Sequence, residues 1–199
     1  QKTAYEIMPS LVGSEMCIRD STTSATNVFG FGESNLHRVL HMDSVRRMQD
    51  DAASEGRMGF TSFVPWPVIL GNNSFGSRNR GQNRLTLGAG PTEYLRHVAI
   101  SRLFLDNVPH IQASWPTMGF EVAQIALLAG ADDAGSTMME ENVVSASGTT
   151  ETEATEEELQ RMILRAGFRP RRRDSDYEPL ETDVLCEELP TPVPLQPDS

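Results

Sequence analysis

The sequence predicts an α/β fold, because short strand-like segments alternate with longer helix-like segments along the chain. The strand-like segments are runs of β-branched and aromatic residues, most of them closed by glycine or proline. The segments between them are long enough, and rich enough in good helix formers, to be helices. Repetition of this pattern implies parallel strands with right-handed crossovers, in either an open sheet or a closed barrel.

The predicted elements follow one another in regular order. Strands are expected at residues 27–31, 60–64, 111–114 and 133–138. Helices are expected at residues 36–52, 92–105 and 120–129, and between Thr155 and Gly167. The first strand, NVFGF, is followed by Ser34 and Asn35, either of which can cap the first helix.

Prolines mark the ends of the second and third predicted strands. Pro65 and Pro67 follow FTSFV, and Pro116 follows the third strand, where a ring without an N–H cannot continue a ladder. A long segment rich in Gly, Asn and Arg, residues 68–90, then precedes Pro91, which suits the first turn of a helix. A loop of this length in a compact domain is usually functional or disordered.

The last two helices carry the clearest local signals. The helix at 120–129 is apolar nearly all round, so we expect it to be covered on several sides. Thr155 and Glu158 form a capping-box pattern at the start of the final helix, and Gly167 stands where its C-terminal glycine is expected. The apolar stripe of that helix, at spacings of three and four, is Leu159, Met162, Ile163 and Ala166.

Composition excludes several classes of protein. The net charge of −11 argues against a nucleic-acid partner, since phosphate binding draws on surplus Lys and Arg. The chain contains no apolar run long enough to span a membrane. Cys17 and Cys186 are far apart and match no metal spacing, and nothing indicates an oxidising compartment, so we expect a cytoplasmic protein.

The two ends of the chain differ in character from the rest. Residues 9–21, PSLVGSEMCIRDS, have no secondary-structure period and resemble a string that arises when sequencing-adapter DNA is translated, so residues 1–21 are expected to be non-native. Residues 174–199 are acidic and rich in proline, a composition typical of disorder. The expected domain therefore covers residues 22–173.

Side chains that can bind a polar ligand occur just after the predicted strands, where parallel strand–helix folds place their reacting groups. The candidate ligand-binding residues are Glu33, Trp66, Ser114, Trp115, Asp133, Ser136, Thr137, Glu140, Glu141 and Asn142. Carboxylates and hydroxyls at these positions suit the hydroxyls and amines of a nucleoside, and the two indoles suit stacking on a flat ring.

Each group of candidates also has a purely structural interpretation. Glu33 can instead be an acid stabilised by the start of the following helix, and the two tryptophans can belong to the core. The acidic residues can cap turns. They lack histidine partners and a fixed ligand spacing, and His37 with His41 lacks a third ligand, so no metal site is predicted.

Several sequence blocks, in order, resemble one family of radical S-adenosylmethionine (SAM) enzymes. The blocks are GFTSFVPWP, EYLRHVAISRLFLDN, IQASW, GADDAGSTMMEENVV and LQRMILRAGFRPRRRD. They resemble the C-terminal half of cyclic dehypoxanthinyl futalosine synthase, also called dehypoxanthine futalosine cyclase, of menaquinone biosynthesis. The likeness covers roughly residues 26–177. One departure is Phe31, where the family usually has histidine before the glutamate at Glu33.

This resemblance implies a fold, a reaction and cofactors. The fold would be the C-terminal half of a (β/α)8 TIM-type barrel. The reaction would be cyclisation of dehypoxanthine futalosine, a small nucleoside-like substrate. SAM and a [4Fe–4S] cluster would be the cofactors of the full-length enzyme, but the CxxxCxxC motif that binds the cluster is absent here, so this chain is expected to be inactive alone.

Two alternatives stay open at this point. Within the superfamily, the parent enzyme could be a subunit of FO synthase or an aminofutalosine synthase-like enzyme. From another class, the chain could be a non-catalytic binding module.

Overall fold

The computed structural model of this chain describes residues 23–71, 76, 87–137 and 154–180. Its centre is a parallel sheet of three strands in the order β1–β2–β3. The strands are β1 (Thr23–Phe29), β2 (Phe60–Pro67) and β3 (His110–Ile111). A single parallel bridge between Gln112 and Asp133 adds a fourth position beside β3. The predicted α/β class with parallel strands is thus confirmed.

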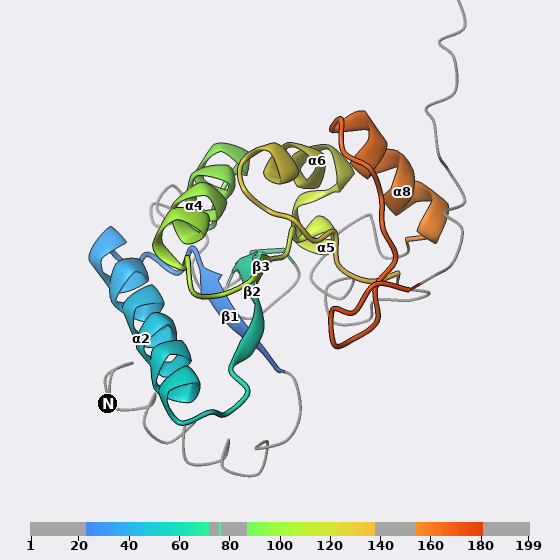
Figure 1. The fold of residues 1–199 in the computed structure, drawn as a ribbon. Coiled ribbons are helices and arrows are strands. Elements are labelled where there is room, and N and C mark those ends of the chain that lie inside the picture. Colours follow the sequence, from blue (N-terminus) through green and yellow to red (C-terminus); the bar gives the residue numbers. More distant parts are fainter. Residues whose placement is uncertain (1–22, 72–75, 77–86, 138–153, 181–199) are drawn as a thin grey trace, which may run out of the picture.

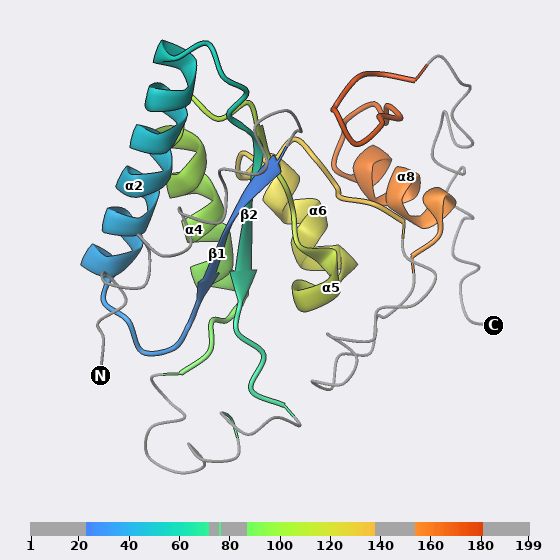
Figure 2. The same cartoon turned by 90° about the horizontal axis from the view of Figure 1, so that it is seen from below.

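The main helices follow the strands and form an arc along one side of the sheet (Figure 1). They are α2 (Asn35–Ser54), α4 (Pro91–Phe104), α6 (Phe120–Leu128) and α8 (Glu156–Arg165). Seen from below, β1 and β2 run side by side, with α2 and α4 on one side of them, α6 on the other, and α8 beyond α6 (Figure 2). The core between sheet and helices includes Phe29, Met42, Phe63, Tyr94, Val98, Ile111, Trp115, Ala126, Leu159 and Met162.

Residues of β1 alternate between two environments, as a strand covered on one face requires. Phe29 is fully buried and its ring lies 4.4 Å from that of His97 on α4. Val28, which points to the other face, is 51% exposed. One face of the sheet is therefore packed against helices, and the opposite face is open along β1.

The bounds of the first two strands differ from the prediction. β1 begins at Thr23 and ends at Phe29, because Gly30 turns the chain with a φ of 98°. β2 continues through Pro65 and Pro67, which were expected to end it. The Phe63 carbonyl faces β3, accepting from the Gln112 N–H at 3.0 Å. Alternation puts both proline nitrogens on that same side, beyond the end of β3, so no ladder bond is lost.

The third and fourth strands are shorter than predicted. β3 consists of two residues, and Trp115 begins a short helix, α5 (Trp115–Met118), instead of simply ending a strand. The expected strand at 133–138 is reduced, in the described residues, to the one bridge at Asp133. Its small residues supply few side chains to hold a longer ladder.

The predicted helix caps are confirmed. Ser34 caps α2 and accepts from the His37 N–H at 3.4 Å. Thr155 and Glu158 form the capping box of α8, with the Thr155 N–H donating to Glu158 at 2.9 Å. Gly167 has a φ of 84°, as expected after the end of a helix.

The expectation of disorder from residue 174 does not hold for residues 174–180, which form an ordered turn. Asp174 accepts hydrogen bonds from the backbone N–H groups of Asp176 and Glu178, both at 2.9 Å. Local capping by an aspartate orders a segment that composition alone marks as disordered. Residues 181–199 and the expected N-terminal artefact at 1–21 lie outside the described residues.

Candidate functional site

Three of the predicted site residues lie near the carboxyl ends of neighbouring parallel strands. Glu33 follows β1, Trp66 is the penultimate residue of β2, and Ser114 comes three residues after the end of β3. Strands that run in parallel end at the same edge of a sheet, so these residues share one edge. Glu140, Glu141 and Asn142 lie outside the described residues.

Glu33 is held by its own turn. Its carboxylate accepts from the Gly30 N–H at 2.9 and 3.1 Å and from the Phe31 N–H at 2.7 Å. Arg38 donates to the same carboxylate at 2.6 Å. Burial acts to raise the pKa of Glu33, but the hydrogen bonds from Gly30, Arg38 and Phe31 outweigh it and lower the pKa. Glu33 is therefore an anion that fixes the loop after β1.

Arg38 connects this loop to α4. Its guanidinium also pairs with Glu93 at 2.7 Å and lies 4.8 Å from the centre of the Phe29 ring. The same Phe29 ring also contacts buried His97, which shares a 3.0 Å hydrogen bond with the Asn27 side chain. The position of Glu33 thus depends on contacts with both neighbouring helices.

Trp66 differs from the other candidates because its polar atom is unpaired. The residue is half-buried, and its indole nitrogen Nε1 is buried without a hydrogen-bond partner. A buried N–H without an acceptor is unfavourable, and such groups are rare in folded proteins. Among the described candidates, Trp66 is the one whose buried polar atom has no hydrogen-bond partner.

Ser114 and Trp115 are both buried. Tyr94 accepts from the Ser114 backbone N–H at 2.7 Å, and the Ser114 hydroxyl bonds to that of Thr117 at 2.7 Å. The Trp115 ring is 1% exposed and stacks on Phe120 at 5.4 Å. These contacts match the core interpretation of Trp115 and give Ser114 a role in shaping the loop after β3.

Asp133, Ser136 and Thr137 border a cavity of about 700 Å³ between α6, α8 and residues 168–180. Ser136 and Thr137 are exposed on its wall. Asp133 is only 8% exposed, and its carboxylate accepts from Arg173 at 2.7 Å and from the Tyr177 hydroxyl at 2.8 Å. The three residues therefore share a cavity, but only the two hydroxyls are open to it.

The structure adds contacts that sequence reasoning missed. Tyr177 was assigned to a disordered tail, yet its ring stacks on His110 at 4.3 Å. Arg173 pairs with Asp133, a contact that its place in a run of arginines does not indicate. A single aromatic residue within a polar, acidic segment was the one available signal for Tyr177.

The residues of this chain do not fit an iron–sulfur cluster. A [4Fe–4S] cluster is held by cysteine thiolates, and the sequence has only Cys17 and Cys186. Within the described residues, no group of three or more His, Cys, Asp or Glu side chains is placed to hold a metal ion. The described helices also include none long and apolar enough to cross a membrane.

Comparison with known proteins gives a consistent result. Residues 57–185 match the family described as the CofH/MqnC C-terminal region. The chain is 46% identical over 159 residues to a cyclic dehypoxanthine futalosine synthase from Halalkalibacterium halodurans, covering 80% of this chain and 39% of that protein. It is 38% identical to an aminodeoxyfutalosine synthase from Thermus thermophilus, covering 78% of this chain and 40% of that protein.

A third relative, from Methanopyrus kandleri, is a 5-amino-6-(D-ribitylamino)uracil–L-tyrosine 4-hydroxyphenyl transferase, 37% identical over 80% of this chain and 41% of its own length. The chain thus spans about two-fifths of the length of these curated relatives. The match covers most of the described sheet and helices from β2 onward. This chain belongs to the CofH/MqnC C-terminal family.

Proposed function

We propose that this chain is the carboxyl-terminal part of a radical SAM enzyme that cyclises dehypoxanthine futalosine to cyclic dehypoxanthinyl futalosine. The observation that carries the proposal is the 46% identity over 159 residues to a cyclic dehypoxanthine futalosine synthase. A second relative of that name, from Streptomyces coelicolor, is 41% identical over 158 residues. Both identities are higher than the 33–38% found for the differently named relatives.

The fold supports half of a (β/α)8 barrel. Three parallel strands and the bridge at Asp133 supply four consecutive strand positions, each followed by a helix. The face of β1 away from the helices is open and carries Ser24, Thr26 and Val28. In a closed barrel this face would point into the interior, where a polar substrate binds at the carboxyl ends of the strands.

The part of the chemistry assigned to this chain is binding and orientation. SAM and the [4Fe–4S] cluster would supply the radical, and this chain's cysteines do not fit the cluster, so no reaction step is assigned to its residues. We assign to Trp66 an indole N–H for an oxygen of the substrate, and to Ser136 and Thr137 hydroxyls exposed in the cavity. Glu33 keeps the loop after β1 in place at the carboxyl edge of the sheet.

The test is a chimera, because the curated relative supplies the region that this chain does not match. Residues 23–180 of this chain would replace the aligned region of the Halalkalibacterium halodurans protein. The expected result is cyclisation of dehypoxanthine futalosine with SAM under anaerobic, reducing conditions. Turnover of 5-amino-6-(D-ribitylamino)uracil and tyrosine instead, by a folded chimera that retains its cluster, would refute the assignment.

A substitution in the chimera separates binding from folding. Trp66→Phe keeps the aromatic bulk and removes only the N–H, so we expect kcat/KM to fall by about tenfold, the size of one lost hydrogen bond. Leu103→Ala is the control, because Leu103 is 83% exposed on α4 and should leave kcat/KM unchanged. Equal activities of Trp66→Phe and the unsubstituted chimera would remove Trp66 from the site.

A further inference from the structure

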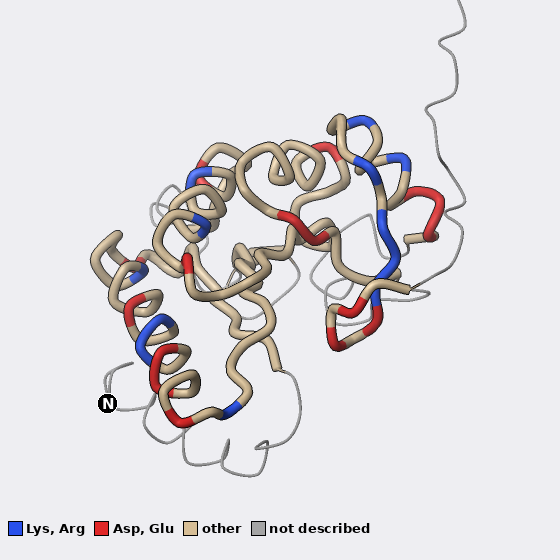
Figure 3. The backbone as a smooth tube through the Cα atoms, viewed as in Figure 1, with Lys and Arg blue, Asp and Glu red and all other residues tan. Residues whose placement is uncertain are grey.

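The segment after α8, residues 169–180, is called here the C-terminal strap. It leaves the end of α8, carries a run of arginines and then an acidic turn, and lies against the far side of the sheet from α2 (Figure 3). Near its start, Arg172 pairs with Glu156 on α8. The strap forms one wall of the cavity that also contains Ser136 and Thr137.

The strap is closed by hydrogen bonds within itself. Asp174 donates its backbone N–H to the Glu178 carbonyl at 3.0 Å, and Leu180 donates to the Arg172 carbonyl at 3.1 Å. Arg173 and Pro179 form an antiparallel bridge between the two arms. Because these backbone bonds are internal, side chains hold the strap against the sheet, and a turn this short loses its own hydrogen bonds readily once those side-chain contacts open.

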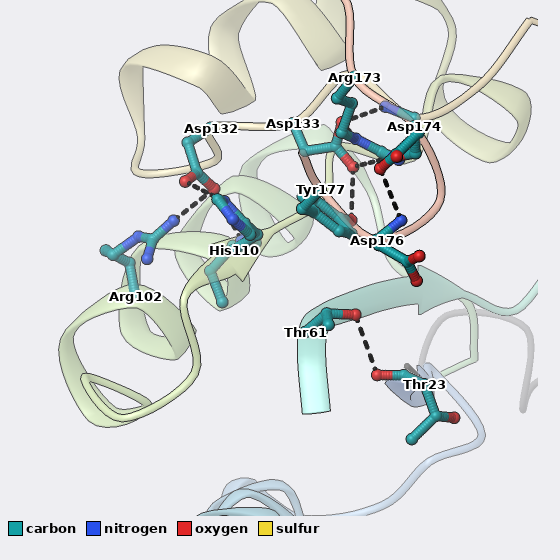
Figure 4. A network of polar contacts seen from close by, with 12 residues as sticks. Thr23, Thr61, Arg102, His110, Asp132, Asp133, Arg173, Asp174, Asp176 and Tyr177 are labelled. Carbon is teal, nitrogen blue, oxygen red and sulfur yellow. Dashed lines mark hydrogen bonds and ion pairs between the residues drawn. The ribbon is translucent and has the colours of Figure 1, made fainter. Parts of the chain in front are cut away.

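Tyr177 is the main contact between the strap and the sheet. Its ring stacks on His110, with ring centres 4.3 Å apart and planes within 10°, and the Arg173 guanidinium lies 3.9 Å from the ring centre on the strap side (Figure 4). Its hydroxyl donates to Asp133 at 2.8 Å and bonds to Ser62. These contacts hold Tyr177 at a φ of 65°, a left-handed conformation unfavourable for a residue with a side chain.

The residues that receive Tyr177 lie toward the amino end of the sheet. His110 is the first residue of β3, and Ser62, its register partner on β2, lies near the start of that strand. The candidate ligand residue Trp66 lies at the opposite, carboxyl end of β2. The strap therefore covers the amino end of the sheet, opposite the carboxyl edge at which Glu33, Trp66 and Ser114 lie.

Asp133 joins the strap to the wall of the cavity. Its carboxylate holds both Arg173 and Tyr177, and one of the same oxygens accepts from the Gly135 N–H at 3.2 Å. Its backbone carbonyl accepts from the Ala113 N–H at 2.8 Å, next to Ser114. Asp133 therefore connects the strap both to the loop after β3 and to the cavity wall at Gly135.

We propose that the C-terminal strap is a latch that opens as a unit from the amino end of the sheet while the sheet stays folded. Arg173 and Tyr177 make the ion pair, the hydrogen bonds and the ring contact that join the strap to the sheet. A segment held through side chains in this way can open locally before the whole protein unfolds. Opening removes one wall of the cavity. The inference depends only on these contacts, so it stands or falls separately from the proposed substrate.

The test is hydrogen–deuterium exchange of the full chain, followed by mass spectrometry. The reporters are the backbone N–H groups of Asp174, Glu178 and Leu180 in the strap, compared with those of β2. In the unsubstituted chain we expect the strap reporters to exchange at least about tenfold faster than β2, as local opening requires. Tyr177→Phe removes only the hydroxyl, and should speed exchange in the strap by about a further tenfold with β2 changed less than about twofold.

Two further variants complete the test. Asp133→Asn should accelerate the strap as Tyr177→Phe does, and Arg171→Ala, on an exposed strap residue, should not change it. Should Asp133→Asn fail to fold, Tyr177→Phe still decides the question. Equal exchange rates for strap and β2 in the unsubstituted chain would overturn the latch, and so would a Tyr177→Phe strap that exchanges no faster.

Discussion

His97 gives the sharpest quantitative prediction, which concerns stability against acid. The imidazole is 4% exposed, stacks on Phe29 and shares a hydrogen bond with Asn27. Burial, the largest cause, acts with the charges of Arg38 and His41 to lower the pKa of His97 to about 4, while the charge of Glu33 opposes them. The folded protein therefore keeps His97 neutral at pH values at which the unfolded chain protonates it.

The sign of the effect follows from proton binding. Between the ordinary histidine pKa of about 6.5 and the folded value near 4, the unfolded state binds more protons, so the free energy of unfolding falls as pH falls. Between pH 7.5 and pH 5, a shift from 6.5 to 4 costs about 2 kcal/mol, and below pH 4 the full cost is about 3.4 kcal/mol. The stability is fully present above about pH 7.

The assay is urea unfolding monitored by circular dichroism at several pH values. His97→Gln removes the titrating group, so the stability advantage of the unsubstituted chain over this variant should shrink by about 2 kcal/mol from pH 7.5 to pH 5. His41→Gln is the matched control on α2, because it leaves His97 in place and should retain most of that loss. Parallel pH curves for the unsubstituted chain and His97→Gln, differing by a constant amount, would refute the reasoning.

Three further substitutions test the local geometry by the same unfolding assay. Gly30→Ala should cost about 1–3 kcal/mol, because the residue has a φ of 98° and a new Cβ would lie 2.9 Å from the backbone of Gly88; an unchanged midpoint would contradict the described turn. Tyr94→Phe should cost about 1–3 kcal/mol by leaving the buried Ser114 N–H unpaired. Thr155→Ala should cost about 1 kcal/mol through loss of the α8 cap, and Thr155→Ser should retain the stability.

Local signals in the sequence predicted the helices well. Capping at Thr155, a proline at the first turn of α4 and the apolar stripe of α8 are all decided by neighbours within a few residues, and each is present in the structure. Strand bounds depend on partners far away in the chain. The continuation of β2 through Pro65 could not be predicted, because it depends on where β3 ends.

The contacts of the candidate residues were also hard to predict where their partners lie far away in the chain. Residue type and position suggested a polar contact for Asp133, and its carboxylate is indeed fully engaged, but its partners come from residues 40 and 44 positions further along the chain. Trp115 stacks on Phe120, only a few residues further along, which agrees with the core interpretation and not with the ligand-binding one. Spacing therefore pointed to segments that follow the strands, whereas the accessibility of each side chain required the fold.

The two prolines of β2 have a consequence for the loop that contains Ser114. A neighbouring strand can extend only while it meets main-chain donors, and Pro65 and Pro67 offer none toward β3. The chain after Ile111 is thus free to leave the sheet and start α5 within a few residues. The backbone donors that β2 lacks at Pro65 and Pro67 therefore set the point at which the Ser114 loop leaves the sheet. Replacing both prolines with valine would restore these donors, and β3 should then lengthen while the Ser114 loop shortens.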